Sequence, residues 1–414
     1  MWSVFLLTSE KMASVKDFLP VFCLMAFAVV SAPLLQADEE VFQTPQTYIV
    51  IADSAPLMVG DDPAGVLQLG TVVTVTRAQG AWRYCPDRTG WVHLRDLVPL
   101  EQAVETFSTE IQRKPTARAY QLRGIAYLSQ EQWAKAAQDF EQAYDLGESA
   151  VALHLNLGAC YERLGQMPAA MQEYDSILET YPDDVSASLA RGNLLLMQGQ
   201  FQAALRDLTK ATQLNPKSAE AWNARGVSLR MLGRYEKAIR SYSKAIELDQ
   251  TDPDARANRG YARKQIGKLA EALEDYEAAL TLAPDSAAIR NDLAWFLATT
   301  SDDTLRDSKR AVELSEAICQ ETRNENGEYL DTLSAAYASL GRFPAAVEAA
   351  RLALTVLGQN PGAARIQDRL ALYQQKKPYV EAIEAVIDPV SLPEAADQAT
   401  EPAPAQPVST KVSS

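Results

Sequence analysis

The sequence predicts a mostly α-helical protein, a right-handed α-solenoid of helix pairs preceded by a small all-β barrel. Two observations support this fold class. Strand-like alternation of β-branched and aromatic residues fills residues 45–100, and a 34-residue period follows it. The chain has 414 residues, of which 47 % are hydrophobic, so it can bury more than one core.

The first residues are typical of an export signal. Lys16 precedes an apolar run that ends before Asp38, so residues 1–37 are predicted to be a signal peptide. The charged flank fits best with translation starting at Met12. Prolines interrupt the run, and it is short for a membrane-spanning helix. We therefore expect a periplasmic or secreted protein with no stable membrane span after cleavage.

Residues 45–100 should form about five short antiparallel strands, separated by turn signals. The glycine and valine run after Gly70, the tryptophan Trp82 and the later Gly90-Trp91-Val92 resemble a bacterial SH3-like (SH3b) domain. The resemblance implies a barrel that binds cell-wall peptides or proteins. An aromatic surface for this role would consist of Trp82, Tyr84 and Trp91, but the same side chains could be the core of a small domain.

The 34-residue period rests on aligned small and aromatic residues. The aligned glycines are Gly124, Gly158, Gly192, Gly226 and Gly260, and an alanine follows each of them twelve residues later. The units resemble tetratricopeptide repeats (TPR), and the fourth unit matches the motif at Trp222, Gly226, Leu229, Gly233, Tyr235, Ala238, Tyr242 and Ala245. Small residues at these positions allow two antiparallel helices to approach closely.

The period predicts the organisation of the rest of the chain. Seven units are expected at 117–150, 151–184, 185–218, 219–252, 253–286, 287–326 and 327–360. A helix over 101–116 should cap one end, and helices over 361–387 should cap the other. Residues 388–414 are rich in proline and poor in apolar residues, so they are expected to be disordered.

Composition and motifs argue against several classes of function. A net charge of −15 disfavours nucleic acid as a partner. Two histidines and four dispersed cysteines give no metal-ligand spacing, and no phosphate loop or nucleophile motif occurs. We expect no enzymatic activity, no cofactor and no metal. The spacing of Cys85, Cys160 and Cys319 neither predicts nor excludes a disulfide, and buried thiols are the favoured interpretation.

The TPR resemblance implies a protein–protein interaction scaffold, here of the cell envelope, that binds partner segments in its concave groove. One arc of each first helix faces this groove in TPR proteins. The candidate residues on that arc are Ile125, Leu155, Leu189, Asn193, Asn223, Val227, Arg230 and Tyr261, and the same arc carries Leu128, Leu196 and Lys264. The same residues could instead pack against neighbouring helices. An alternative function is a cell-wall-binding accessory, in which the barrel recognises wall peptide and the repeats are a spacer.

Four units carry an arginine before the aligned glycine, namely Arg123, Arg191, Arg225 and Arg259. Helical geometry places this position about 150° from the groove arc. We therefore predict that these arginines do not bind a ligand. Their stems should pack between helices while their guanidinium groups pair with carboxylates of the same or the preceding unit.

Overall fold

The computed structural model describes residues 39–60, 62–358 and 360–382. These residues form two compact units, 39–194 and 195–382, each of which is described by itself. The predicted signal peptide and the predicted disordered tail lie outside the described residues.

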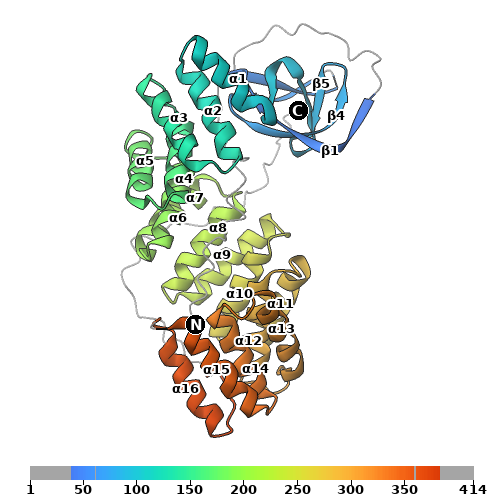
Figure 1. The fold of residues 1–414 in the computed structure, drawn as a ribbon, viewed down its shortest axis with the longest axis vertical. Coiled ribbons are helices and arrows are strands. Elements are labelled where there is room, and N and C mark those ends of the chain that lie inside the picture. The colour runs from blue at the N-terminus through green and yellow to red at the C-terminus, as the bar shows by residue number, and fades with distance from the viewer. Residues whose placement is uncertain (1–38, 61, 359, 383–414) are drawn as a thin grey trace, which may run out of the picture. The chain divides into compact units, whose positions relative to one another are not determined.

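An antiparallel sheet of seven strands opens the first unit (Figure 1). The strands are β1 (Glu39–Val50), β2 (Ser54–Val59), β3 (Asp62–Gln68), β4 (Val72–Gln79), β5 (Trp82–Cys85), β6 (Gly90–His93) and β7 (Leu97–Pro99). Their order across the sheet is β3-β2-β6-β5-β4-β1-β7, and no ladder joins β3 to β7 within the described residues.

The open sheet corrects the expectation of a closed barrel of about five strands. The sequence pattern predicts no strand at β2 and only the end of β3, from Val66, because Asp62 and Pro63 at the start of β3 have the composition of a turn. Proline, which has no backbone N–H, is tolerated there because β3 is an edge strand and the N–H groups on its outer side pair with no neighbouring strand in the described part of the chain. The other source of error is β1, whose first half, through Pro45, lacks apolar alternation but pairs with β4 across a register shift.

The sheet packs against the first helices of its unit. α1 (Leu100–Arg113) and α2 (Ala117–Ser129) share one hydrophobic core with β1, in which Ile49, Phe107 and Leu122 are buried. A methyl group at Gly70, between β3 and β4, would lie 2.4 Å from Cδ1 of Ile125 on α2. The sheet therefore covers part of the first repeat.

Sixteen α-helices occur in the described part of the chain. After α1 and α2, the first unit contains α3 (Trp133–Asp145), α4 (Val151–Arg163) and α5 (Met167–Thr180), and the boundary between the units falls within α6 (Val185–Met197). The second unit contains α7 (Phe201–Leu214), α8 (Ala219–Met231), α9 (Tyr235–Leu248), α10 (Pro253–Gln265), α11 (Leu269–Leu282), α12 (Ala287–Thr299), α13 (Ser308–Glu321), α14 (Gly327–Ser339), α15 (Phe343–Leu357) and α16 (Ala363–Gln374).

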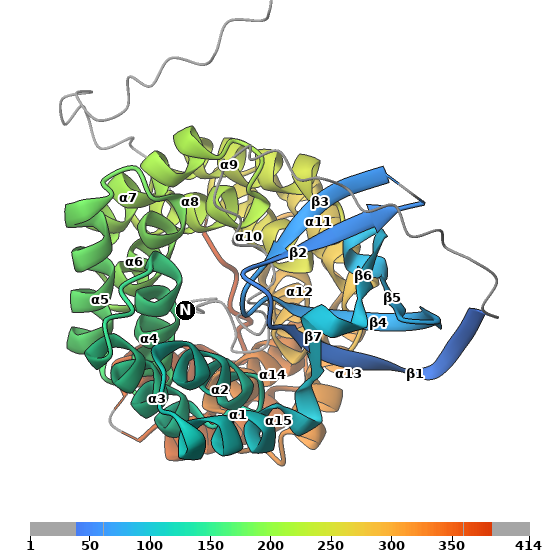
Figure 2. The ribbon, with the colours of Figure 1, turned by 90° about the horizontal axis from the view of Figure 1, so that it is seen from above.

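In the second unit the first helix of each pair lies on the inner side of a curve. Figure 2 shows α8, α10, α12 and α14 on this side and their partners α9, α11 and α13 outside them. Helices were expected over 361–387, but within the described residues no helix follows α16. Instead, residues 377–382 run without regular structure along the inner side of α10 and α12 (Figure 2).

Two glycines of the second unit, Gly158 and Gly165, have different structural roles, which explains why most units have a glycine at two positions. A methyl group at Gly158 on α4 would lie 2.5 Å from Cε1 of Tyr174 on α5, so the close helix contact leaves no room for a side chain. Gly165, which follows α4, has a φ of 73°, and a methyl group there would meet no atom within 4 Å. It ends the helix through its left-handed backbone conformation.

The structure confirms that the repeated arginines join helices. Nε of Arg259 donates to Asp275 at 2.9 Å and its Nη2 at 2.7 Å, and Arg123 binds Asp139 in the same bidentate way. Arg191 pairs with Asp175 of the preceding unit at 2.7 Å. In the fourth unit, Arg225 donates to the hydroxyl groups of Thr209 at 3.2 Å and Ser241 at 2.6 Å.

Candidate functional site

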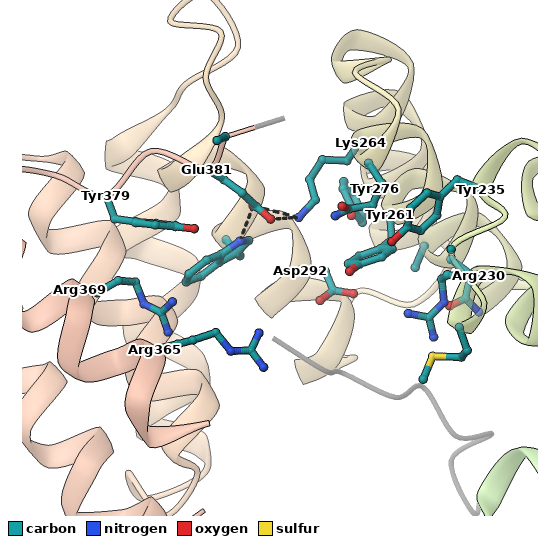
Figure 3. A pocket seen from close by; sticks show the side chains of 17 residues that line it. Arg230, Tyr235, Tyr261, Lys264, Tyr276, Asp292, Arg365, Arg369, Tyr379 and Glu381 are labelled. Atoms are coloured by element: carbon teal, nitrogen blue, oxygen red, sulfur yellow. Dashed lines mark hydrogen bonds and ion pairs between the residues drawn. The ribbon is translucent and has the colours of Figure 1, made fainter. Parts of the chain in front are cut away.

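A cavity of about 420 Å³ lies within the second unit, between α8, α10, α12, α16 and the segment 377–382 (Figure 3). Helical spacing brings its side chains together. Tyr261 and Lys264 are three residues apart on α10, and Arg365 and Arg369 are four apart on α16. Cationic and aromatic groups from separate helices thus face one space.

Glu381 fixes the segment 377–382 to the cavity wall. Nζ of Lys264 donates to its two carboxylate oxygens at 3.1 and 3.0 Å, and Nε1 of Trp295 donates to one of them at 2.8 Å. The backbone N–H of Glu381 also donates to the carbonyl oxygen of Thr299 at 2.7 Å. Burial alone would raise the pKa of Glu381, but Lys264 and these hydrogen bonds outweigh burial and lower it.

An aromatic contact holds the segment at a second point. The ring of Tyr379 lies 5.9 Å from that of Trp295, and the guanidinium carbon of Arg369 lies 5.5 Å from the centre of the Tyr379 ring. Arg369 is itself buried, and its Nε donates to Asp331 at 3.0 Å. The segment is therefore held in the manner of a bound peptide, by its backbone, a carboxylate and an aromatic ring.

Arg230 stands across the cavity from this segment. It is only 8 % exposed, and its Nε and Nη2 have no hydrogen-bond partner among the described residues. The ring of Tyr261 lies between two cations, with the Arg230 guanidinium carbon 5.2 Å and Nζ of Lys264 5.1 Å from its centre. A buried cation with unused donors is costly unless an anion joins it.

Asp292 on α12 is the acidic residue between these cations (Figure 3). Burial raises the pKa of its carboxyl group to about 7, although the nearby Lys264 and Arg230 act to lower it. The carboxylate of Glu328 acts in the same direction as burial. Asp292 therefore changes charge near neutral pH, and the net charge of the cavity changes with it.

The structure brings Arg230 and Tyr261, two of the predicted groove residues, into this cavity, together with Lys264 from the same arc. Asn223 and Val227 are buried on α8 and are not part of the cavity lining. The Oδ1 atom of Asn223 is buried without a hydrogen-bond partner in the described residues.

The other predicted groove residues belong to the first unit and are mostly buried. Ile125 packs beneath the β-region, and Leu189 and Asn193 are each 6 % exposed. Leu155 is partly buried and packs against the cluster that contains Tyr174. These positions fit the alternative of helix packing, and the groove role assigned to them stays a prediction.

Sequence reasoning missed most of the site. Trp295 stands at position nine of its unit, the position of Tyr261 in the unit before, so the same arc extended by one repeat would have found it. Asp292 lies outside the arc, at position six. Arg365 and Glu381 follow the last repeat, where the period gives no signal.

The predicted aromatic surface lies on β5 and β6. Trp82, Tyr84 and Trp91 are partly exposed and lie outside the hydrophobic core of the sheet. The rings of Tyr84 and Trp91 are 5.2 Å apart, and the Arg77 guanidinium covers Tyr84 at 3.8 Å. The aromatics thus form a surface cluster, part of which is covered by an arginine.

Few groups in the described residues have the features of a catalytic centre. No cluster of three or more potential metal ligands occurs there. Cys85, Cys160 and Cys319 are buried free thiols, and burial raises the pKa of the first two to about 12 and of the third to about 11. None of the helices described has the length and apolar composition of a membrane-crossing helix.

Comparison with known proteins identifies the repeats. A tetratricopeptide repeat family model matches residues 122–185, 189–253 and 258–305, and a second TPR model matches 241–274. The helix pairs in these ranges are therefore tetratricopeptide repeats. The chain thus combines a TPR region with an N-terminal all-β region. No curated protein sequence matches it.

Solved TPR structures resemble parts of the chain. A tetratricopeptide repeat protein from Parabacteroides merdae is 18 % identical over 66 % of this chain and 99 % of its own, with a TM-score of 0.48. A thermophilic TPR protein from Thermus thermophilus is 22 % identical over 44 % of this chain and 99 % of its own, with a TM-score of 0.37. MamA from Desulfovibrio magneticus is 20 % identical over 41 % and 96 %, with a TM-score of 0.38.

Proposed function

We propose that this protein is a non-enzymatic docking protein whose second unit binds an extended acidic segment of a protein partner in the cavity. The observation that supports this proposal is the segment 377–382, which already lies there as a peptide would. Its Glu381 engages Lys264 and Trp295, and its backbone engages Thr299. TPR repeats are in general protein–protein interaction modules, which fits a site of this kind.

The chemistry of the bound segment defines the partner. Tyr379 and Glu381 are the two side chains that make its specific contacts. A partner segment with an aromatic residue two positions before a glutamate would make the same contacts. It would bind by displacing residues 377–382, so the chain carries its own competitor.

We place this activity in the cell envelope. Residues 1–37 have the features of a signal peptide, and this is the basis for proposing a periplasmic or secreted scaffold. The N-terminal β-region would supply a second contact and raise the effective concentration of the partner at the cavity.

Fluorescence anisotropy with a labelled peptide tests the proposal. The probe is Lys-Pro-Tyr-Val-Glu-Ala, the sequence of residues 377–382, titrated with the full-length Glu381→Gln variant to weaken self-occupation. Adding Lys264→Met should weaken binding at least tenfold, because the peptide carboxylate loses its cation.

The matched control is Lys268→Met, which removes the same charge from a side chain that is 53 % exposed. It should leave the affinity unchanged. Equal affinity of the Lys264→Met and Lys268→Met proteins, or no binding of the peptide by the Glu381→Gln protein itself, would show that this cavity is not the docking site.

A cell-wall-binding role for the β-region is the second candidate, and the partial exposure of Trp82, Tyr84 and Trp91 favours it. Purified wall sacculi incubated with the full-length protein should then retain it, and Trp91→Ala should abolish retention while Lys264→Met does not. The whole chain is required, because the sheet shares a core with α1 and α2. Failure of sacculi to retain the protein excludes this role.

A further inference from the structure

Charge pairing in the cavity leaves one buried cation with unused donors. Four cations line the cavity, Arg230, Lys264, Arg365 and Arg369. Lys264 is paired with Glu381, and Arg369 is paired with Asp331. Arg365 is exposed and interacts with the carboxylate of Glu328. Arg230 is therefore the buried cation of the cavity whose nearest lining carboxylate is that of Asp292, and it has donors free for a second acceptor.

Arg230 is built to receive that charge. It is more than nine-tenths buried, since it is 8 % exposed, and two of its nitrogen atoms lack acceptors among the described residues. Figure 3 shows its guanidinium group directed into the cavity, on the side opposite Arg365. A planar guanidinium matches the geometry of a carboxylate, which can accept two of its hydrogen bonds at once.

We propose that Arg230 is the centre of a second anion subsite, which binds a carboxylate side chain of the docked partner segment. This inference rests on the proposed function and adds a second acidic residue to the partner motif. The partner then places one carboxylate at Lys264 and Trp295, where Glu381 lies, and the other at Arg230.

The second subsite explains how a partner can displace the chain's own segment. Residues 377–382 satisfy Lys264 and leave the Nε and Nη2 atoms of Arg230 without acceptors in the described part of the chain. A segment with two carboxylates satisfies both cations and therefore binds more tightly than the resident segment. A doubly charged phosphate would be repelled by Asp292 more strongly than a singly charged carboxylate.

A glutamate scan of a peptide probe tests the subsite. The parent probe is Gly-Gly-Gly-Pro-Tyr-Val-Glu-Gly-Gly-Gly, in which each glycine is replaced in turn by glutamate, and for reference by glutamine. Affinities are measured by anisotropy with the full-length Glu381→Gln protein and with the same protein carrying Arg230→Met or Arg230→Lys. At one position glutamate should bind at least tenfold more tightly than glutamine.

The variants identify the cation responsible for that advantage. Arg230→Met should reduce the advantage of glutamate to less than twofold while the glutamine probe, which reports intact folding, binds as before. Arg230→Lys should retain part of it, because the charge remains and the bidentate geometry is lost.

Four outcomes overturn the subsite, one of them measured with phosphoserine in place of glutamate in the probe. If the probes bind and no glutamate position has an advantage, the subsite is wrong and the docking proposal stands. An advantage that persists in Arg230→Met assigns the carboxylate to another group, and tighter binding of phosphoserine than of glutamate at that position refutes the choice of a carboxylate. If no probe binds, the docking proposal fails as well.

Discussion

Replacing Glu381 with glutamine should release the segment 377–382 and open the cavity to a partner. The change keeps the shape of the side chain and removes its charge. It leaves the tyrosine contact and the backbone hydrogen bond to Thr299 in place. The effect therefore measures the contribution of one carboxylate.

The size of the effect follows from the contacts of that carboxylate. It accepts hydrogen bonds from Lys264 and Trp295. In its ion pair with Lys264, the lysine side chain is 10 % exposed and the Glu381 side chain is 28 % exposed. A charge-assisted hydrogen bond contributes about 1.5–3 kcal/mol, and partial exposure reduces this, so we expect about 2 kcal/mol. That energy corresponds to roughly a 30-fold shift from the bound to the released segment.

Peptide affinity reports the shift. A ligand that binds only the released state has an apparent affinity equal to its intrinsic affinity multiplied by the fraction of protein in the released state. The labelled 377–382 peptide should therefore bind the full-length Glu381→Gln protein up to about 30-fold more tightly than the wild type. Glu348→Gln is the matched control, because it removes the same charge from an exposed residue of α15.

The reasoning is refuted if Glu381→Gln binds the peptide with the affinity of the wild type or more weakly. The same holds if Glu348→Gln strengthens binding as much, since the effect would then come from net charge. Exchange of the Trp295 indole N–H gives an independent measurement, and it should accelerate in Glu381→Gln because the indole loses its charged acceptor.

Three further changes test the cavity and the repeats. Affinity for the acidic peptide should fall as pH rises from 6 to 8, because Asp292, with its pKa of about 7, becomes negative and repels the ligand. Peptide titrations of the Asp292→Asn protein over the same pH range should show no such fall. Gly158→Ala should lower the free energy of unfolding by about 1–3 kcal/mol in urea titrations, because its methyl group would collide with Tyr174; an unchanged midpoint would contradict the packing. Arg259→Met removes the bidentate partner of Asp275, which is 3 % exposed, and leaves it with the hydrogen bond from Arg263 at 2.7 Å. The change should cost about 1–3 kcal/mol, measured by thermal unfolding; an unchanged melting temperature would mean that Arg263 alone suffices.

The repeats were predictable because their information is periodic. A glycine that must allow close helix contact, as at Gly158, recurs at one spacing, and so does an arginine that joins neighbouring helices, as at Arg259. The sheet was harder to predict because pairing depends on partners distant in sequence. The edge strand β3 begins with Asp62 and Pro63, whose local preference is for a turn.

The cavity was only partly predictable for a related reason. Arg230 and Tyr261 lie on the helical arc that faces the groove, and the arc rule therefore found them. Glu381 has no place in the period, and its contact with Lys264 joins residues separated by 117 positions. The raised pKa of Asp292 arises from burial in the assembled cavity, which the residues around it in sequence do not determine.

The two glycines of each repeat should differ in how freely they are replaced during evolution. Gly165 is constrained by its backbone conformation, and the residue 34 positions before it, Glu131, adopts a similar positive φ of 58° with a full side chain. Such a conformation costs an L-residue about 1–2 kcal/mol, which a stable repeat array tolerates. Gly158 is constrained by its neighbour, which occupies the space of a methyl group. In the seventh unit Ser334 stands at this interhelix position, and Ala350 stands where the facing helix of the second unit has Tyr174. Gly341 keeps the turn of the seventh unit, with a φ of 79°. Replacement of the interhelix glycine should therefore require a second change in the facing helix, whereas the turn glycine can be replaced alone.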